Sequence, residues 1–135
     1  MSETILVTGA NGLVSSSVID GLLQIPDIKV RALVHDEPKA YPLKGRGVDV
    51  VAGDLDDPHS LTKAFEGVDK VWSLVPFGPA APQQSSNITW AARQGGVRKV
   101  VRMSAIGAAG DAPTRNGRLH ALSDAELQGS GLNAA

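Results

Sequence analysis

The chain has 135 residues, of which 42% are hydrophobic and 20% are charged, and its formal net charge is −1 at pH 7. This length suits one hydrophobic core, the composition excludes a disordered chain, and the charge excludes the broad basic surface of a nucleic-acid-binding protein. The sequence contains no cysteine, which excludes disulfides, thiolate chemistry and cysteine-based metal sites.

The N-terminal residues show no secretion signal, and no apolar stretch reaches the ~18 residues that a membrane helix needs. We therefore expect one cytoplasmic domain over residues 1–135, with no membrane partner, no nucleic-acid partner and no bound metal.

The first predicted element is a short apolar strand over residues 5–7, followed by a turn that contains Gly9 and Gly12 and then by a helical pattern that ends near Gln24. In a dinucleotide-binding turn, one glycine permits the sharp exit from the strand and another lets the backbone approach a diphosphate. The helix that follows presents its free N–H groups to that charge. Ser15 stands where a third glycine is usual, and a short glycine motif is weak evidence alone. An ordinary strand-to-helix turn is the alternative.

Further runs rich in β-branched residues cover residues 28–34, 48–51, 71–75 and 97–103, with helical patterns between most of them. Strands that alternate with helices predict a parallel sheet covered on both faces. Because crossover connections are right-handed, the predicted fold class is α/β, a Rossmann-like doubly wound parallel sheet. The segment that contains Pro38 and Pro42 is poorly patterned.

Polar residues follow directly after the second and third predicted strands. At the end of the second strand, an acidic side chain favours a free ribose 2′-hydroxyl and a cationic one accommodates a 2′-phosphate. His35 and Asp36 stand there, either in that role or as a solvated polar pair. Asp54 either accepts a hydrogen bond from an adenine amino group or stabilises its own turn. Asp57, followed by Pro58, predicts a helix N-cap.

The fourth strand leads into a proline-rich loop over residues 76–82, which either lines a nicotinamide pocket or is an ordinary connection. Ser104 follows the fifth strand at the same sheet edge, where its hydroxyl either orients a ligand group or caps the turn. Residues 107–117 predict a loop and residues 119–127 a helix. His120 and Asp124 are four residues apart on that helix, a spacing that permits contact and is more often a surface pair than a catalytic one.

The ordered motifs resemble the NmrA-like, NAD(P)-binding family of the atypical short-chain dehydrogenase/reductase superfamily, a group that includes NADPH-dependent quinone reductases. The matching stretches cover nearly the whole chain and are residues 5–12, 30–35, 53–57, 64–69, 96–104 and 130–132. The cofactor-binding residues that the resemblance implies are Gly9, Asn11, Gly12, Leu13, His35, Asp54, Leu55 and Ser104.

The chain departs from the family pattern in three places. Many relatives have an arginine where this chain has His35, so the resemblance implies NADP with NAD as the alternative. No Tyr-x-x-x-Lys pair follows Ser104, and the sole tyrosine is Tyr41, which makes Ser104 and His120 the catalytic candidates. Relatives continue beyond the equivalent of residues 130–132 into a further strand and a substrate-binding region, which we expect to be missing here.

Two functions follow as expectations. The first is an NAD(P)H-dependent oxidoreductase that transfers hydride to a small carbonyl or quinone substrate. The second is a non-catalytic, dinucleotide-binding redox sensor that regulates a protein partner. An exposed sheet edge also makes a homo-oligomer an expectation.

Overall fold

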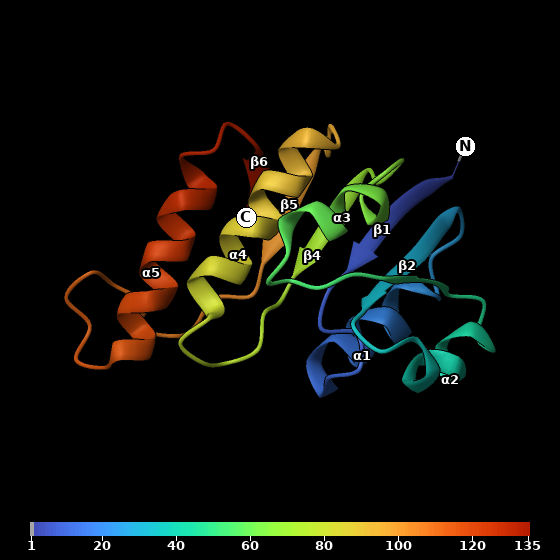
Figure 1. The fold of residues 1–135 in the computed structure, drawn as a ribbon, viewed down its shortest axis with the longest axis horizontal. Coiled ribbons are helices and arrows are strands. Elements are labelled where there is room, and N and C mark those ends of the chain that lie inside the picture. The colour runs from blue at the N-terminus through green and yellow to red at the C-terminus, as the bar shows by residue number, and fades with distance from the viewer. Residues whose placement is uncertain (1) are drawn as a thin grey trace.

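The computed structural model describes residues 2–135 and forms a six-stranded sheet in the order β3-β2-β1-β4-β5-β6 (Figure 1). Every pair of neighbouring strands is parallel. The strands are β1 Glu3–Val7, β2 Ile28–Val34, β3 Asp49–Ala52, β4 Lys70–Ser73, β5 Lys99–Arg102 and β6 Asn133–Ala134. The strand order reverses direction between β1 and β4, which confirms the doubly wound Rossmann-like prediction.

The helices connect these strands and are α1 Leu13–Leu22, α2 Tyr41–Lys44, α3 Pro58–Ala64, α4 Ala81–Gln94 and α5 Arg115–Gln128, with a 3₁₀ helix η1 Glu37–Ala40 before α2. The poorly patterned segment is therefore helical, and α4 begins inside the proline-rich loop. Prolines stand in the first turns of η1, α2 and α4, where a missing N–H costs no helical hydrogen bond. Proline spacing alone therefore understated the helix content.

Two apolar cores lie on opposite faces of the sheet. On one face, Leu6 packs with Leu61, Phe65 and Ile88, which belong to the region of α3 and α4. On the other face, Val7 packs in a cluster with residues of α1 and α2. Figure 1 shows α3, α4 and α5 together on one side of the sheet, away from α1 and α2. Because successive strand residues point to opposite faces, neighbouring apolar residues of β1 supply both cores.

Side-chain caps fix the start of two helices. The carboxylate of Asp57 accepts a hydrogen bond from the N–H of His59 over 3.1 Å, which confirms the predicted N-cap. The hydroxyl of Thr114 accepts one from the N–H of Gly117 over 3.0 Å. The cap at Thr114 starts α5 at Arg115, four residues before the predicted position.

Within residues 2–135, none of the helices has the length and apolar character that a membrane crossing requires. The same described residues contain no group of three or more His, Cys, Asp or Glu side chains arranged to hold a metal ion. The two tryptophans lie on opposite sides of the sheet and make packing contacts. Trp72 packs against the core on the α1 face, and Trp90 meets the His59 ring edge-on at 5.7 Å.

Candidate functional site

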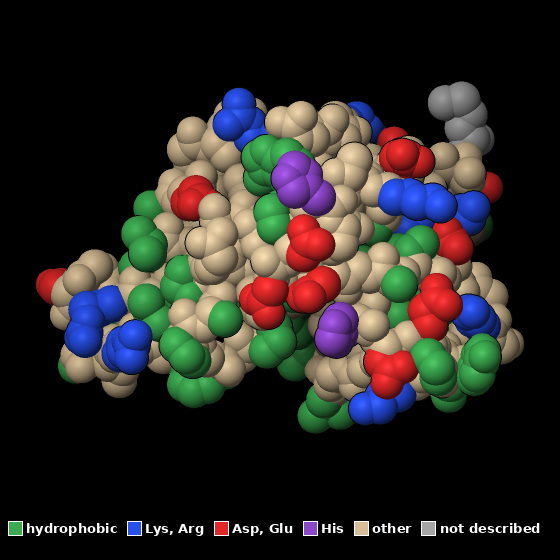
Figure 2. All heavy atoms as spheres, in the orientation of Figure 1, with side chains coloured by type: hydrophobic (Ala, Val, Ile, Leu, Met, Phe, Trp, Pro, Cys, Tyr) green, Lys and Arg blue, Asp and Glu red, His purple; other side chains and the backbone are tan. Residues whose placement is uncertain are grey.

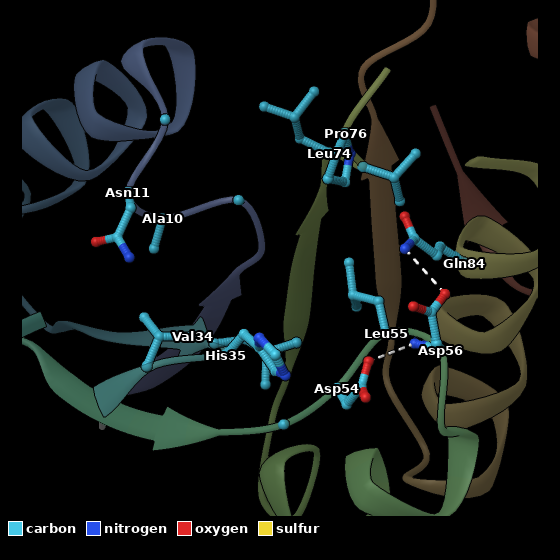
Figure 3. A pocket seen from close by; sticks show the side chains of 15 residues that line it. Ala10, Asn11, Val34, His35, Asp54, Leu55, Asp56, Leu74, Pro76 and Gln84 are labelled. Carbon is cyan, nitrogen blue, oxygen red and sulfur yellow. Dashed lines mark hydrogen bonds between the residues drawn. The ribbon is translucent and has the colours of Figure 1, made fainter. Parts of the chain in front are cut away.

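A cavity of about 540 Å³ opens at the carboxyl ends of β1, β2, β3 and β4 (Figure 3). Its walls come from residues 9–12, 33–35, 53–56 and 74–76, with Gln84 of α4. This position spans the point where the strand order reverses. Open α/β sheets bind their ligands at that switch point, and the volume lies in the ~300–1,000 Å³ range of small-molecule sites.

The turn after β1 is closed tightly by its glycines. Gly9 has φ +64°, and a Cβ atom there would lie 3.3 Å from the carbonyl oxygen of Leu74. The N–H of Gly12 donates to the carbonyl of Gly9 over 2.8 Å. Gly12 is also the N-cap of α1, and no side chain of the described chain caps that end. The first N–H groups of α1 are therefore available to an anion.

A buried hydroxyl takes the place of the third glycine. Ser15 is fully buried, and its hydroxyl donates to the carbonyl of Thr8 over 2.7 Å. The indole N–H of Trp72 donates to the same hydroxyl oxygen over 3.1 Å. The hydroxyl of Thr8 in turn donates to the carbonyl of Leu74 and accepts from its N–H, each over 2.7 Å. These contacts hold α1 against the ends of β1 and β4, beside the cavity.

His35 and Asp36 end β2 at the rim of the site. His35 is exposed and lines the cavity. Asp36 pairs with Lys39 over 3.9 Å, and both side chains are largely exposed. The cavity-facing group at the end of β2 is therefore the imidazole.

The turn after β3 carries an acidic rim. The carboxylate of Asp54 accepts a hydrogen bond from the N–H of Asp56 over 2.9 Å, which is the turn-stabilising contact that the sequence suggested. A carboxylate has lone pairs for further donors, so the predicted adenine contact stays a prediction. Figure 2 shows acidic side chains gathered near the middle of the viewed face. Asp54 and Asp56 both line the cavity, so its β3 end disfavours an anion and its α1 end favours one.

Two polar residues of α4, one in the cavity lining and one close by, escaped sequence reasoning. Gln84 donates to the carboxylate of Asp56 over 3.0 Å (Figure 3). One turn later on α4, Asn87 donates to the carbonyl of Leu55 over 2.8 Å. A Cβ at Gly53 would lie 2.7 Å from a terminal methyl group of Leu33, so a larger residue there would require the Leu33 side chain to move. No local pattern marks Gln84 and Asn87, because each acts through a contact with a distant segment.

The cavity brings together most of the predicted cofactor-binding residues, namely Gly9, Asn11, Gly12, His35, Asp54 and Leu55. Leu13 and Ser104 do not belong to its lining. Leu13 is 87% exposed at the start of α1. Ser104 donates to the carboxylate of Asp124 over 2.6 Å.

Arg102 links the catalytic candidates to one another. Its guanidinium contacts Asp124 at 2.6 Å and the Nδ1 atom of His120 at 3.1 Å. The sequence suggested a contact between His120 and Asp124. In the structure, both side chains contact Arg102 of β5. Burial lowers the pKa of His120, the positive charge of Arg102 lowers it further, and Asp124 opposes both effects.

Comparison with known proteins identifies the relatives of this chain. The NmrA-like family model matches residues 1–115. The chain is 40% identical over 128 residues to an NAD(P)H azoreductase of Xenophilus azovorans, which covers 95% of this chain and 44% of that protein. It is 33% identical over 105 residues to quinone oxidoreductase 2 of Escherichia coli K12, covering 76% of this chain and 36% of that protein.

Two solved structures share the fold at 29% sequence identity. The Citrobacter triphenylmethane reductase complexed with NADP(H) superposes with a TM-score of 0.88 and covers 97% of this chain and 47% of that one. The NADPH-dependent quinone oxidoreductase of Escherichia coli complexed with NADPH superposes with a TM-score of 0.87, covering 96% and 46%. In each of these four comparisons the chain spans less than half the length of its relative. On sequence and on structure, the chain belongs to the NmrA-like family.

Proposed function

We propose that this chain binds NADP(H) in the cavity between β1 and β4 and acts as an NAD(P)H-dependent oxidoreductase on a small carbonyl or quinone substrate. The observation that carries the proposal is the uncapped start of α1 behind the tight turn of Gly9 and Gly12, set at the mouth of a cavity of about 540 Å³. That arrangement has the shape and the charge that a diphosphate requires.

The residues present fit a dinucleotide. The N–H groups at the start of α1 would hold the diphosphate, and the glycines let the backbone approach it closely. Asp54 would accept a hydrogen bond from the adenine amino group, and Leu55 would lie beside the adenine. The acidic rim of Asp54 and Asp56 would set the orientation of the dinucleotide in the cavity. Its diphosphate would be repelled by these carboxylates and attracted to the start of α1.

His35 would contact the 2′ position of the adenosine ribose. Its imidazole can donate a hydrogen bond to a phosphate oxygen, and its protonated form can also pair with the phosphate charge. Asp36 is paired with Lys39, which reduces its repulsion of a 2′-phosphate. These contacts favour NADP(H) over NAD(H), in keeping with the NADP(H) and NADPH complexes of the two structural relatives.

The bound nicotinamide supplies the hydride, and the protein supplies binding and orientation. Ser104 and His120 would lie toward the reacting end, because Ser104 comes two residues after β5 at the carboxyl edge of the sheet. Reduction of a quinone or carbonyl is supported by the relatives, one of which is named a quinone oxidoreductase and another an azoreductase.

Calorimetric titration of the full chain with NADPH and with NADH tests the binding step. We expect saturable binding of NADPH and weaker binding of NADH. A second assay follows the absorbance of the reduced nicotinamide in the presence of a panel of quinones and carbonyl compounds. Absence of dinucleotide binding overturns the proposal, whereas binding without oxidation of NADPH across the panel replaces the enzyme with a dinucleotide-dependent regulator.

A further inference from the structure

A buried arginine lies at the centre of a polar cluster next to β5, which we call the Arg102 cluster. Its members are Ser85, Arg102, Ser104, His120 and Asp124. The side chain of Arg102 is only 4% exposed. Its Nε atom donates to the hydroxyl of Ser85 over 3.1 Å. One terminal nitrogen donates to the Oδ1 atom of Asp124 over 2.6 Å, and the other lies 3.1 Å from Nδ1 of His120. The guanidinium fork is therefore fixed on three sides.

The contact with Arg102 decides the protonation of His120. A guanidinium has only donors and no acceptor. In a hydrogen bond over the 3.1 Å between Arg102 and His120, Nδ1 must therefore be the acceptor. A neutral imidazole that accepts at Nδ1 carries its hydrogen on Nε2, whereas an imidazolium would turn a second N–H toward the guanidinium. The lowered pKa of His120, caused by burial and then by the Arg102 charge against the opposing Asp124, agrees with this geometry.

The contact with Asp124 decides whether the Ser104 hydroxyl can donate or only accept a further hydrogen bond. The serine hydroxyl has one hydrogen, and it is donated to the Oδ2 atom of Asp124 over 2.6 Å. This length is in the ~2.5–2.7 Å range of a hydroxyl bound to an ionised carboxylate. The other oxygen of Asp124 is held by Arg102, so the carboxylate is fixed at both ends. Ser104 therefore has only its lone pairs left for a ligand.

We propose that Arg102 is a positioning residue that holds His120 as a neutral imidazole with its hydrogen on Nε2 and, through Asp124, holds Ser104 as a hydrogen-bond acceptor. The placement of Ser104 and His120 at the reacting end rests on the proposed function. In this state His120 polarises a ligand oxygen by donating a hydrogen bond and does not deliver a proton as an imidazolium. Ser104 binds an N–H or O–H group of the ligand and does not donate to a carbonyl.

Nuclear magnetic resonance of the ¹⁵N-labelled full chain, without dinucleotide, tests the proposal directly. Long-range ¹H–¹⁵N spectra at pH 7 distinguish a protonated from an unprotonated ring nitrogen. The chain has 3 histidines, and His120→Gln identifies the signals of His120 by their loss. We expect an unprotonated Nδ1 and a protonated Nε2. A hydrogen on Nδ1, or an imidazolium at pH 7, overturns the proposal.

Arg102→Met removes the guanidinium while keeping a long side chain. We expect the Nδ1 signal of His120 to move toward an average of the two neutral tautomers, and its titration to shift to higher pH. Arg98→Met is the matched control. Arg98 directly precedes β5, at the end of the strand away from Arg102, and its side chain is 61% exposed and forms an ion pair with Glu3. The control should leave the His120 signals unchanged. A folded Arg102→Met variant with the wild-type His120 tautomer overturns the proposal.

If Arg102→Met fails to fold, the wild-type spectrum still decides the tautomer, and Arg102→Lys provides a second variant. The lysine keeps the charge and loses the planar fork, so we expect it to loosen the tautomer preference of His120. None of these measurements requires a bound dinucleotide. Failure to bind NADPH therefore overturns the proposed function alone, whereas a wrong tautomer overturns the role of Arg102 alone.

Discussion

The hydroxyl of Ser15 in α1 donates a hydrogen bond to the carbonyl oxygen of Thr8, just beyond the end of β1, over 2.7 Å. In dinucleotide-binding turns of the usual sequence, a glycine at this position lets the helix lie close to the strand by having no side chain. Here a side chain is present, and its hydrogen bond draws the helix to the strand. The indole N–H of Trp72 completes the arrangement from β4.

Ser15→Ala should lower the free energy of unfolding by about 1–3 kcal/mol, because it leaves the indole N–H of Trp72 without its acceptor. Chemical denaturation followed by tryptophan fluorescence and by circular dichroism measures the change. Ser17→Ala is the control on the same helix, since Ser17 is exposed, and it should change stability by less than about 0.5 kcal/mol. Equal stability of the two variants would contradict the structural role of Ser15.

Gly12→Ala should weaken NADPH binding at least about tenfold, or about 1.4 kcal/mol. The added Cβ would lie 3.1 Å from the carbonyl oxygen of Gly9, so the turn must shift at the point where the diphosphate approaches. Calorimetric titration measures the affinity.

Gly21→Ala serves as the control for Gly12→Ala, because Gly21 lies in the same helix and a Cβ there meets no atom within 4 Å outside its local surroundings. It should raise stability by about 0.5–1 kcal/mol and leave NADPH affinity unchanged. Wild-type affinity in Gly12→Ala would mean that the diphosphate does not bind at this turn.

His35→Arg should raise the affinity for NADPH relative to NADH by roughly tenfold, because a permanently charged fork binds a 2′-phosphate more strongly than an imidazole does. Titration with both dinucleotides gives the ratio. The control variant is His59→Arg. It adds the same charge at an exposed site beside Trp90, outside the cavity lining. An unchanged ratio in His35→Arg would place the 2′ position elsewhere.

The stability of the wild-type protein should fall with respect to His120→Gln as the pH is lowered through about 6.5. Burial and Arg102 lower the pKa of His120 in the folded state, so in this range the unfolded chain binds more protons. The neutral form stabilises the fold above the unfolded pKa, and this contribution is lost as the pH falls through the lowered pKa.

Urea denaturation of both proteins between pH 8 and pH 5 tests this direction. Glutamine keeps an acceptor for Arg102 but does not titrate, which makes it the matched reference. If the difference between the two proteins stays constant or changes with the opposite sign, the imidazole is not held in its neutral form.

Much of the cavity could be predicted from sequence because its parts are local. The glycines at positions 9 and 12 and the polar residues His35 and Asp54 each follow from turn chemistry next to an apolar run. In a parallel sheet, the residues after successive strands meet at one edge, so local signals also predicted a common site. By contrast, the expectation that no strand follows residues 130–132 was wrong, because Asn133–Ala134 forms β6 beside β5. Two residues are too few for a periodic pattern.

The sequence by itself determined the α/β fold class, the glycine turn between the first strand and the first helix, and the resemblance to the family, because hydrophobic periodicity and turn preferences act over a few neighbouring residues. Only the tertiary structure placed Arg102 between His120 and Asp124 and directed the hydroxyl of Ser104 to Asp124. These partners are separated by 18 to 22 residues along the chain. Which donor meets which acceptor over such separations depends on how α5 packs against α4 and β6, and this packing is not encoded by any local sequence pattern.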